Sequence, residues 1–372
     1  MKNIFRIDIG ENRIYGLDIL RCIAILFVVF AHGIYLLGDR ISNLLGRFDF
    51  DGVSLFFVLS GFLIGGILIK ILETQVISLK TLKNFWIRRW FRTIPNYFLI
   101  LTFLMGLHII IFRDISLWRT LNYFVFLQNL FYKNPYFFNE AWSLSVEEWF
   151  YLLIPILVFC LVGIFHLNIK ASILSTAFSV LIIVTFFRLY RYSNIHANTL
   201  SIQNWDSNFR KQVFTRLDSL VFGVLGAYIS NYYNTLWIKY KNQLFFIGIF
   251  IMSIQITHTY DANSVLYYTV FTFPVTSIGT LCLLPYLSNM KYGKGTIYKV
   301  VTYISIISYS IYLLNFTLIL NNTVSFIHLN FLPEVLRIIT RYCIFWSLTL
   351  FLSFILYKYY EAPMTKLREV LK

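Results

Sequence analysis

The stretch GLDILRCIAILFVVFAHGIYLL, residues 16–37, decides the fold class, because it is long and apolar enough to cross a bilayer as a helix. Two ionisable residues, Arg21 and His32, lie within it, eleven positions apart. At about 100° per residue, eleven steps return to within about 20° of the starting direction, so both side chains share one face, roughly 16 Å apart along the axis. Asp18 falls within about 40° of the same stripe.

Ionisable groups at this depth are costly unless they face protein or water, so the stripe indicates a functional site. The alternative is that Arg21 reaches the lipid headgroups and His32 is a hydrogen-bonded core residue.

The composition of the whole chain agrees with this first segment. Of its 372 residues, 58% are hydrophobic and 13% charged, and the mean hydropathy is +0.68, which excludes a soluble globular domain. Aromatic residues make up 19%, as suits lipid-facing surfaces and interfacial belts. The net charge of +15 comes from short loops between apolar runs, so it reflects membrane topology and not nucleic-acid binding. We expect a polytopic membrane protein in a bilayer.

Apolar runs divide the chain into about ten spans of an all-α transmembrane bundle. They lie at roughly 17–37, 53–72, 93–112, 146–165, 171–188, 214–233, 244–260, 265–287, 300–320 and 336–357. With the N-terminus in the cytoplasm, an even number of spans returns the C-terminus there, and most Lys and Arg residues fall on the inner side. We therefore expect a bacterial inner or plasma membrane protein with both termini cytoplasmic. Residues 1–372 are expected to form one integral-membrane domain, without a soluble C-terminal domain.

The four cysteines, Cys22, Cys160, Cys282 and Cys343, all lie in apolar runs and form no CxxC pair. This pattern predicts neither a disulfide framework nor a metal site. The chain also has no nucleotide-binding glycine motif with supporting context, so no permanently bound cofactor is expected.

A cluster of arginines, Arg88, Arg89 and Arg92, stands at the cytoplasmic entrance to the third span, in IRRWFRTIPNYF. Arg89 and Arg92 are three apart and share a helix face, a geometry that can bind phosphate oxygens. The alternative is an ordinary positive-inside cluster that binds anionic lipid.

A second polar constellation is NEAWSLSVEEWFYLLIP, where Glu147 and Glu148 follow Trp142 at the start of an apolar helix. Ser143 and Ser145 are possible N-caps, and acidic residues in a first turn favour the helix dipole. Glu147 and Tyr151 are four apart, so they share a face that would point into the membrane interior. Capping and a functional role are both open; if Glu147 is functional, we expect Glu148 to be its solvated neighbour.

A third constellation is TRLDSLVFGVLGAY, in which Arg216 and Asp218 begin the sixth span. Taken alone, these two residues favour a local or loop ion pair.

With these segments in order, the chain resembles the acyltransferase 3 family of integral-membrane O-acyltransferases. The resemblance runs from Gly16 to about Glu369, and one family segment, LFFVLSGFLI, contains Ser60. The other segments that carry it are GLDILRCIAILFVVFAH, RRWFRTIPNY, AWSLSVEEWFYLLIP, RLDSLVFGVLGA, SYSIYLLN at 308–315 and YKYYEAP.

The resemblance implies transfer of an acyl group, most often acetyl, from cytoplasmic acyl-CoA to a hydroxyl of a cell-surface or lipid-linked carbohydrate. It implies that His32 and Arg21 are the catalytic pair and that Arg89 and Arg92 bind the acyl-CoA donor. Glu147 joins the catalytic residues by its place in the chamber-facing segment. Further candidate chamber residues are Asp18, Ser60, Trp142, Tyr151, Arg216 and Asp218.

The chain departs from the family pattern at two positions. Asn315 stands where many members carry histidine, and Trp149 replaces a frequent glutamine after the acidic pair. We expect the first to affect any mechanism that uses a second histidine and the second to affect the acceptor pocket. A different class remains as an alternative: a multi-span transporter or flippase, in which the intramembrane charges form a polar pathway.

Overall fold

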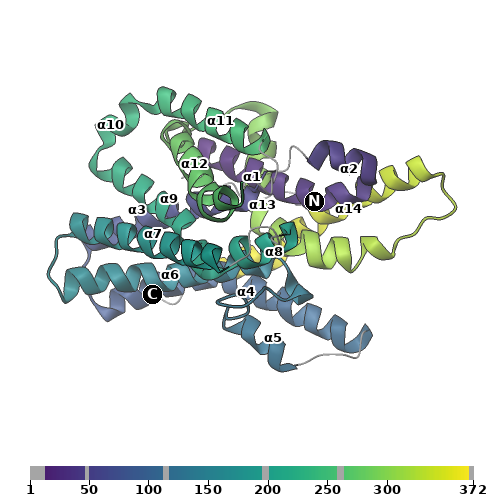
Figure 1. Cartoon of the computed structure of the whole chain (residues 1–372), viewed down its shortest axis with the longest axis horizontal. Coiled ribbons are helices and arrows are strands. Elements are labelled where there is room, and N and C mark those ends of the chain that lie inside the picture. The colour runs from purple at the N-terminus through teal and green to yellow at the C-terminus, as the bar shows by residue number, and fades with distance from the viewer. Residues whose placement is uncertain (1–12, 47–49, 112–116, 195–200, 258–263, 368–372) are drawn as a thin grey trace, which may run out of the picture.

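The computed structural model of the protein describes residues 13–46, 50–111, 117–194, 201–257 and 264–367. Every regular element in these ranges is a helix, as the apolar runs predicted. Figure 1 shows the long helices gathered around α1 (Tyr15–Gly33) and α13 (Gly295–Leu314). The other long helices are α3 (Gly52–Thr74), α4 (Leu79–Ile111), α6 (Ala141–Gly163), α7 (Ile169–Ser193), α9 (Leu217–Tyr232), α11 (Lys241–Thr257), α12 (Thr272–Asn289) and α14 (Glu334–Leu356).

Short helices connect or extend the long ones. Those of α-helical type are α2 (Asp39–Leu45), α5 (Leu117–Phe124), α8 (Ile202–Trp205), α10 (Asn234–Lys239) and α15 (Ala362–Leu367). The 3₁₀ and π segments are η1 (Ile34–Leu37), η3 (Tyr136–Phe138), η5 (Asp206–Arg210), η6 (Val213–Thr215), η8 (Tyr267–Phe271), η9 (Asn315–Asn321), η10 (Val324–Phe326) and η11 (Tyr357–Glu361).

Eight helical segments of the described chain are long and apolar enough to cross a membrane, so the protein is an integral membrane protein. The two other spans expected from the sequence, 214–233 and 244–260, correspond to α9 and α11, which have 16 and 17 residues. At 1.5 Å per residue, α9 is about 24 Å long and α11 about 26 Å, somewhat less than the hydrocarbon thickness of a typical bilayer.

Glycines bring the central helices into close contact. Gly61 of α3 lies against the backbone carbonyl of Leu220 in α9, and Gly223 of α9 lies against that of Val58 in α3. A Cβ atom at either glycine would come within about 2 Å of these carbonyl oxygens, so any larger residue would force the two helices apart. This close approach holds α3, which carries Ser60, beside α9.

Two polar contacts align α1 with α13. Ser305 donates a hydrogen bond to Asp18 near the start of α1, at 2.7 Å, and Asn315 lies 2.5 Å from His32 near its end. The two helices are therefore parallel, with their polar faces toward each other.

Candidate functional site

A cavity of about 110 Å³ lies between α1, α3, α4, α6 and α13. Six of the residues predicted from the sequence line it together: Arg21, Ser60, Arg89, Arg92, Glu147 and Tyr151. The remaining lining residues are Val53, Phe56, Phe57, Leu63, Ile64, Thr93, Ser143, Leu144, Ser308, Tyr309 and Tyr312. We call the end near Arg21, Arg89 and Arg92 the arginine end, and the end near Ser143 and Tyr312 the tyrosine end.

The arginine end carries an excess of positive charge. Arg89 and Arg92 are one helical turn apart on α4, and Arg21 faces them from α1. Arg92 is exposed, whereas Arg21 and Arg89 are half-buried. Glu147 is the carboxylate among the described lining residues, so three guanidinium groups share the cavity with one acidic group. Such an end favours an anionic ligand with several oxygens, such as a phosphate ester.

Glu147 is the centre of a small hydrogen-bond network in the cavity wall. Ser60 Oγ donates to its Oε1 at 3.0 Å, and the Tyr151 hydroxyl donates to its Oε2 at 3.0 Å. Arg21 and Arg92 are within electrostatic range of the same carboxylate. Glu147 and Tyr151 thus share one helix face and point inward, as their i,i+4 spacing predicted.

The expectation for the residues around Glu147 needs two corrections. Ser143 and Ser145 are not N-caps, because α6 begins at Ala141, and their hydroxyls bond to Tyr312 and Gln128. Glu148 is not solvated. It is only 6% exposed and accepts a hydrogen bond from Thr93 Oγ1 at 2.7 Å, because a residue next to Glu147 points about 100° away, into the contact with α4.

His32 and Arg21 occupy different parts of the site. The described lining residues include Arg21 but not His32, which lies three helical turns further along α1. His32 Nδ1 is 2.5 Å from Asn315 Oδ1, and its ring lies against Phe316 with the centroids 4.3 Å apart. Asn315 follows Tyr312 by three residues, so His32 is held just beyond the tyrosine end.

The tyrosine end is closed by hydrogen bonds between α6 and α13. The Tyr312 hydroxyl lies 2.6 Å from Ser143 Oγ and donates to the backbone carbonyl of Glu140 at 2.9 Å. The Glu140 carboxylate accepts hydrogen bonds from the backbone N–H of Thr317, at 3.0 Å, and from the Thr317 hydroxyl. Burial raises the pKa of the Glu140 carboxyl to about 7, although the bonds from Thr317 oppose this rise.

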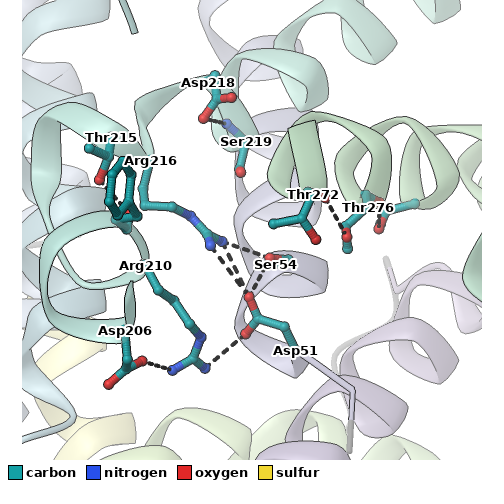
Figure 2. A network of polar contacts seen from close by, with 12 residues as sticks. Asp51, Ser54, Asp206, Arg210, Thr215, Arg216, Asp218, Ser219, Thr272 and Thr276 are labelled. Atoms are coloured by element: carbon teal, nitrogen blue, oxygen red, sulfur yellow. Dashed lines mark hydrogen bonds and ion pairs between the residues drawn. The ribbon is translucent and has the colours of Figure 1, made fainter. Parts of the chain in front are cut away.

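Figure 2 shows a network of charged residues, which reaches the cavity wall where the guanidinium of Arg216 lies 5.4 Å from the ring centroid of the lining residue Phe57. The guanidinium of Arg210 is 3.0 Å from Asp51, and that of Arg216 bonds to Asp51 at 3.4 Å and to Ser54 Oγ at 2.6 Å. Burial opposes ionisation of Asp51, but Arg210 and Arg216 outweigh it and hold the pKa of this carboxyl well below its usual range. Trp142 is packed here, with the guanidinium of Arg210 5.2 Å from its ring centroid.

The expectation of a local ion pair between Arg216 and Asp218 is wrong. Each residue has a partner that is distant in sequence: Arg216 pairs with Asp51, and Asp218 with Arg188 at 2.6 Å. Arg188 and Asp218 are fully buried, so their pairing holds α7 against α9 within the bundle. Spacing within one segment could not reveal these partners.

Asp18 and Trp149 serve helix packing. The Asp18 carboxylate accepts hydrogen bonds from Arg13 and Ser305, away from the described lining of the cavity. The indole N–H of Trp149 donates to the backbone carbonyl of Phe126 at 3.0 Å, so this residue faces the loop before α6.

Five polar lining residues were not among the predicted site residues: Thr93, Ser143, Ser308, Tyr309 and Tyr312. The last three belong to SYSIYLLN, where polar residues at positions i, i+1 and i+4 of an apolar helix were the available signal. Among the described residues, no group of three or more His, Cys, Asp and Glu side chains is arranged to hold a metal ion.

The fold and the cavity define an integral membrane protein with a polar chamber between its helices, and comparison with known proteins adds its family. A family-wide sequence profile described as "Acyltransferase domain" matches residues 14–358. The chain therefore belongs to the acyltransferase 3 family.

Proteins with similar sequences include two from Staphylococcus aureus. The chain is 26% identical over 387 residues to "Putative O-acetyltransferase SACOL0978" of strain COL, a match that covers 94% of this chain and 57% of that protein. It is 32% identical over 228 residues to "O-acetyltransferase OatA" of strain NCTC 8325 / PS 47, covering 58% of this chain and 34% of that protein. The chain thus spans little more than half the length of the relatives that it matches over most of its own length. No solved structure is significantly similar to it.

Proposed function

We propose that the protein is a membrane O-acyltransferase that moves an acyl group, in the first instance acetyl, from cytoplasmic acyl-CoA to a hydroxyl of a cell-surface or lipid-linked carbohydrate. One observation carries this proposal. The cavity extends from three arginines at one end to Tyr312 at the other, three residues before Asn315, which contacts His32. The names of the staphylococcal relatives support an O-acetyl transfer.

The arginine end suits the nucleotide part of acyl-CoA. Arg89 and Arg92 would bind its phosphates through charge-assisted hydrogen bonds, and Arg21 would hold the donor further inside. On α3 the lining residues extend from Val53 to Ile64, and eleven residues of helix cover about 16 Å. The same length separates Arg21 from His32 along α1. A thin pantetheine arm could follow this path and bring the thioester to the tyrosine end, past the Ser60–Glu147–Tyr151 network.

His32 would then act as the general base. A carbohydrate hydroxyl is a poor nucleophile at neutral pH, and a neutral imidazole can remove its proton as the oxygen attacks the thioester carbonyl. The new O–C bond replaces the C–S bond, and the CoA thiolate leaves and takes the proton back from the imidazolium. In this account Glu147 orients Ser60 and Tyr151 in the chamber wall, while Trp142, Arg216, Asp218 and Asp18 keep the surrounding helices in place.

The orientation in the membrane follows from the donor. Acyl-CoA is made inside cells, so the arginine end, the N-terminus and the C-terminus are assigned to the cytoplasmic side of a bacterial plasma or inner membrane. His32 then lies toward the opposite face, where a carbohydrate acceptor would be met.

The test uses the purified protein in lipid nanodiscs with isotope-labelled acetyl-CoA. Slow release of free CoA is expected from the wild type, and its rate should fall about 10²- to 10⁴-fold in His32→Gln because a general base contributes about this much. His328→Gln is the matched control, because His328 is exposed and outside the described cavity lining. Release of no CoA by the wild type, together with movement of a labelled solute across proteoliposomes, would instead identify a transporter.

A further inference from the structure

The contacts of Asn315 determine which end of its side-chain amide faces His32. Asn315 is fully buried, and its Nδ2 donates to the backbone carbonyls of Ile311 and Tyr312, both at 2.9 Å. Carbonyl oxygens only accept, so the amino group of Asn315 must face them. Its carbonyl oxygen Oδ1 is then the atom that lies 2.5 Å from His32 Nδ1.

The identity of this atom decides the protonation of the imidazole. The Oδ1 atom of an amide can only accept a hydrogen bond, so Nδ1 of His32 must carry the proton. A neutral imidazole with a proton on Nδ1 has its lone pair on Nε2. The ring of Phe316 is tilted by 37° against the imidazole, with the ring centroids 4.3 Å apart, and limits rotation of the imidazole about its Cβ–Cγ bond.

The position of Asn315 is itself held from both sides by Glu140. Three residues before Asn315, the Tyr312 hydroxyl donates to the backbone carbonyl of Glu140. Two residues after it, Thr317 donates to the Glu140 carboxylate from its backbone N–H and from its hydroxyl. Glu140 is 3% exposed and stands immediately before α6, so it joins the end of α13 to the start of α6.

We propose that Asn315 is a positioning residue that keeps His32 in the Nδ1–H tautomer with Nε2 as the basic atom, and that Glu140 holds Asn315 in place for this task. The proposal deepens the proposed function, on which its catalytic part rests. An amide orients the ring, as a carboxylate would, but adds no negative charge that would stabilise the imidazolium. The imidazole therefore stays ready to accept the proton of an incoming hydroxyl on Nε2.

The proposal is tested first by a spectroscopic signature that needs no activity. The protein has six histidines. In ¹⁵N-histidine-labelled protein in nanodiscs, the signals of His32 are identified by their loss in His32→Gln. The proposal expects a neutral His32 with protonated Nδ1 and bare Nε2, which is the opposite of the tautomer that dominates for free histidine in water. A wild-type His32 protonated on Nε2 would overturn the proposal whether or not the protein is an enzyme.

Variants of Asn315 then test whether the tautomer of His32 affects catalysis. In Asn315→Leu, the Nδ1–H state should give way to the Nε2–H state, and CoA release should fall about 10- to 100-fold, part of what a general base contributes. In Asn315→Asp an acceptor is restored, so Nδ1–H should persist, transfer should recover, and the acid limb of the pH–rate profile should move to higher pH. Asn321→Leu is the matched control, because Asn321 is exposed in the same helical segment.

Replacement of Thr317 by valine tests the part assigned to Glu140. Thr317→Val keeps the shape and the backbone N–H but removes the hydroxyl that bonds to the carboxylate. We expect a mixture of tautomers at His32 and a loss of transfer of several-fold. An unchanged His32 spectrum in both Thr317→Val and Asn315→Leu would overturn the positioning role. If the wild-type tautomer is as expected but no substrate is ever acylated, the proposed function fails and the tautomer assignment stands.

Discussion

Replacement of Arg89 and Arg92 by glutamine should weaken the binding of acyl-CoA far more than it affects any other step. Both arginines line the arginine end, and Arg21 would be the remaining guanidinium among the described lining residues. A hydrogen bond to a charged group contributes about 1.5–3 kcal/mol. Arg92 is exposed and its contribution is screened by water and salt, so about 1 kcal/mol is assigned to it and about 2 kcal/mol to the half-buried Arg89. The sum of about 3 kcal/mol corresponds to a roughly 100-fold higher Kd.

The assay is equilibrium binding of acetyl-CoA to the purified protein in nanodiscs, with S-acetyl-pantetheine, which lacks the nucleotide phosphates, as the second ligand. The double variant should lose affinity for acetyl-CoA, and this loss should shrink as salt is raised, while affinity for S-acetyl-pantetheine stays unchanged. Arg88→Gln is the matched control, because Arg88 is an exposed neighbour outside the described lining. Equal losses of acetyl-CoA affinity in Arg88→Gln and in the double variant, or equal losses for both ligands in the double variant, would refute a phosphate site here and favour binding of anionic lipid.

Three further predictions concern the wall of the cavity, the tyrosine end and the membrane orientation. Glu147→Gln should lower the rate of CoA release about tenfold, because it removes the charge from hydrogen bonds worth about 1.5 kcal/mol. The control Glu73→Gln, at an exposed position, should not change this rate. Equal rates in the two variants would leave Glu147 a packing residue only. Burial raises the pKa of Glu140 from 4.5 to about 7, so the folded protein binds this proton more tightly than the unfolded chain, and its free energy of unfolding should fall as pH rises through that interval, by on the order of 3 kcal/mol. Glu140→Gln should remove this part of the pH dependence of thermal unfolding. An identical pH dependence in the wild type and the variant would contradict the prediction. Single cysteines at the exposed Lys83 and Tyr136, in a background without the four native cysteines, should label from opposite sides with a membrane-impermeant reagent. Labelling of both from outside intact cells would contradict the orientation.

The sequence was most informative about features that depend on local spacing. Hydropathy alone predicted an all-helical membrane bundle, and the i,i+4 spacing of Glu147 and Tyr151 predicted their shared inward face, where they are hydrogen-bonded. The family resemblance paired Arg21 with His32, whereas in the structure Arg21 lines the cavity with Arg89 and Arg92 of α4, a helix far from α1 in the chain.

The features that the sequence did not reveal are contacts between distant segments. Asp51 pairs with Arg210 and Arg216, more than 150 residues away, and no local pattern specifies such partners. The bonds between Glu140 and Thr317 likewise join positions 177 residues apart, which no local spacing predicts. Glu148 was expected in solvent but is buried. Neighbouring helices decide whether the side chain next to an inward-facing one is covered, and local spacing does not specify those helices.

If the chain transfers an acyl group to a carbohydrate with His32 as the base, the product is an acylated glycan. Its formation depends on the chain and on His32. This dependence is tested most directly by mass spectrometry of surface and lipid-linked glycans from cells that carry the wild-type gene, the His32→Gln variant, the His328→Gln control or no gene. We expect glycan species heavier by one acyl group in cells with the wild type and with His328→Gln, and their absence with His32→Gln and without the gene. Acylated glycans at wild-type levels with His32→Gln, or identical spectra in all four strains, would contradict this expectation.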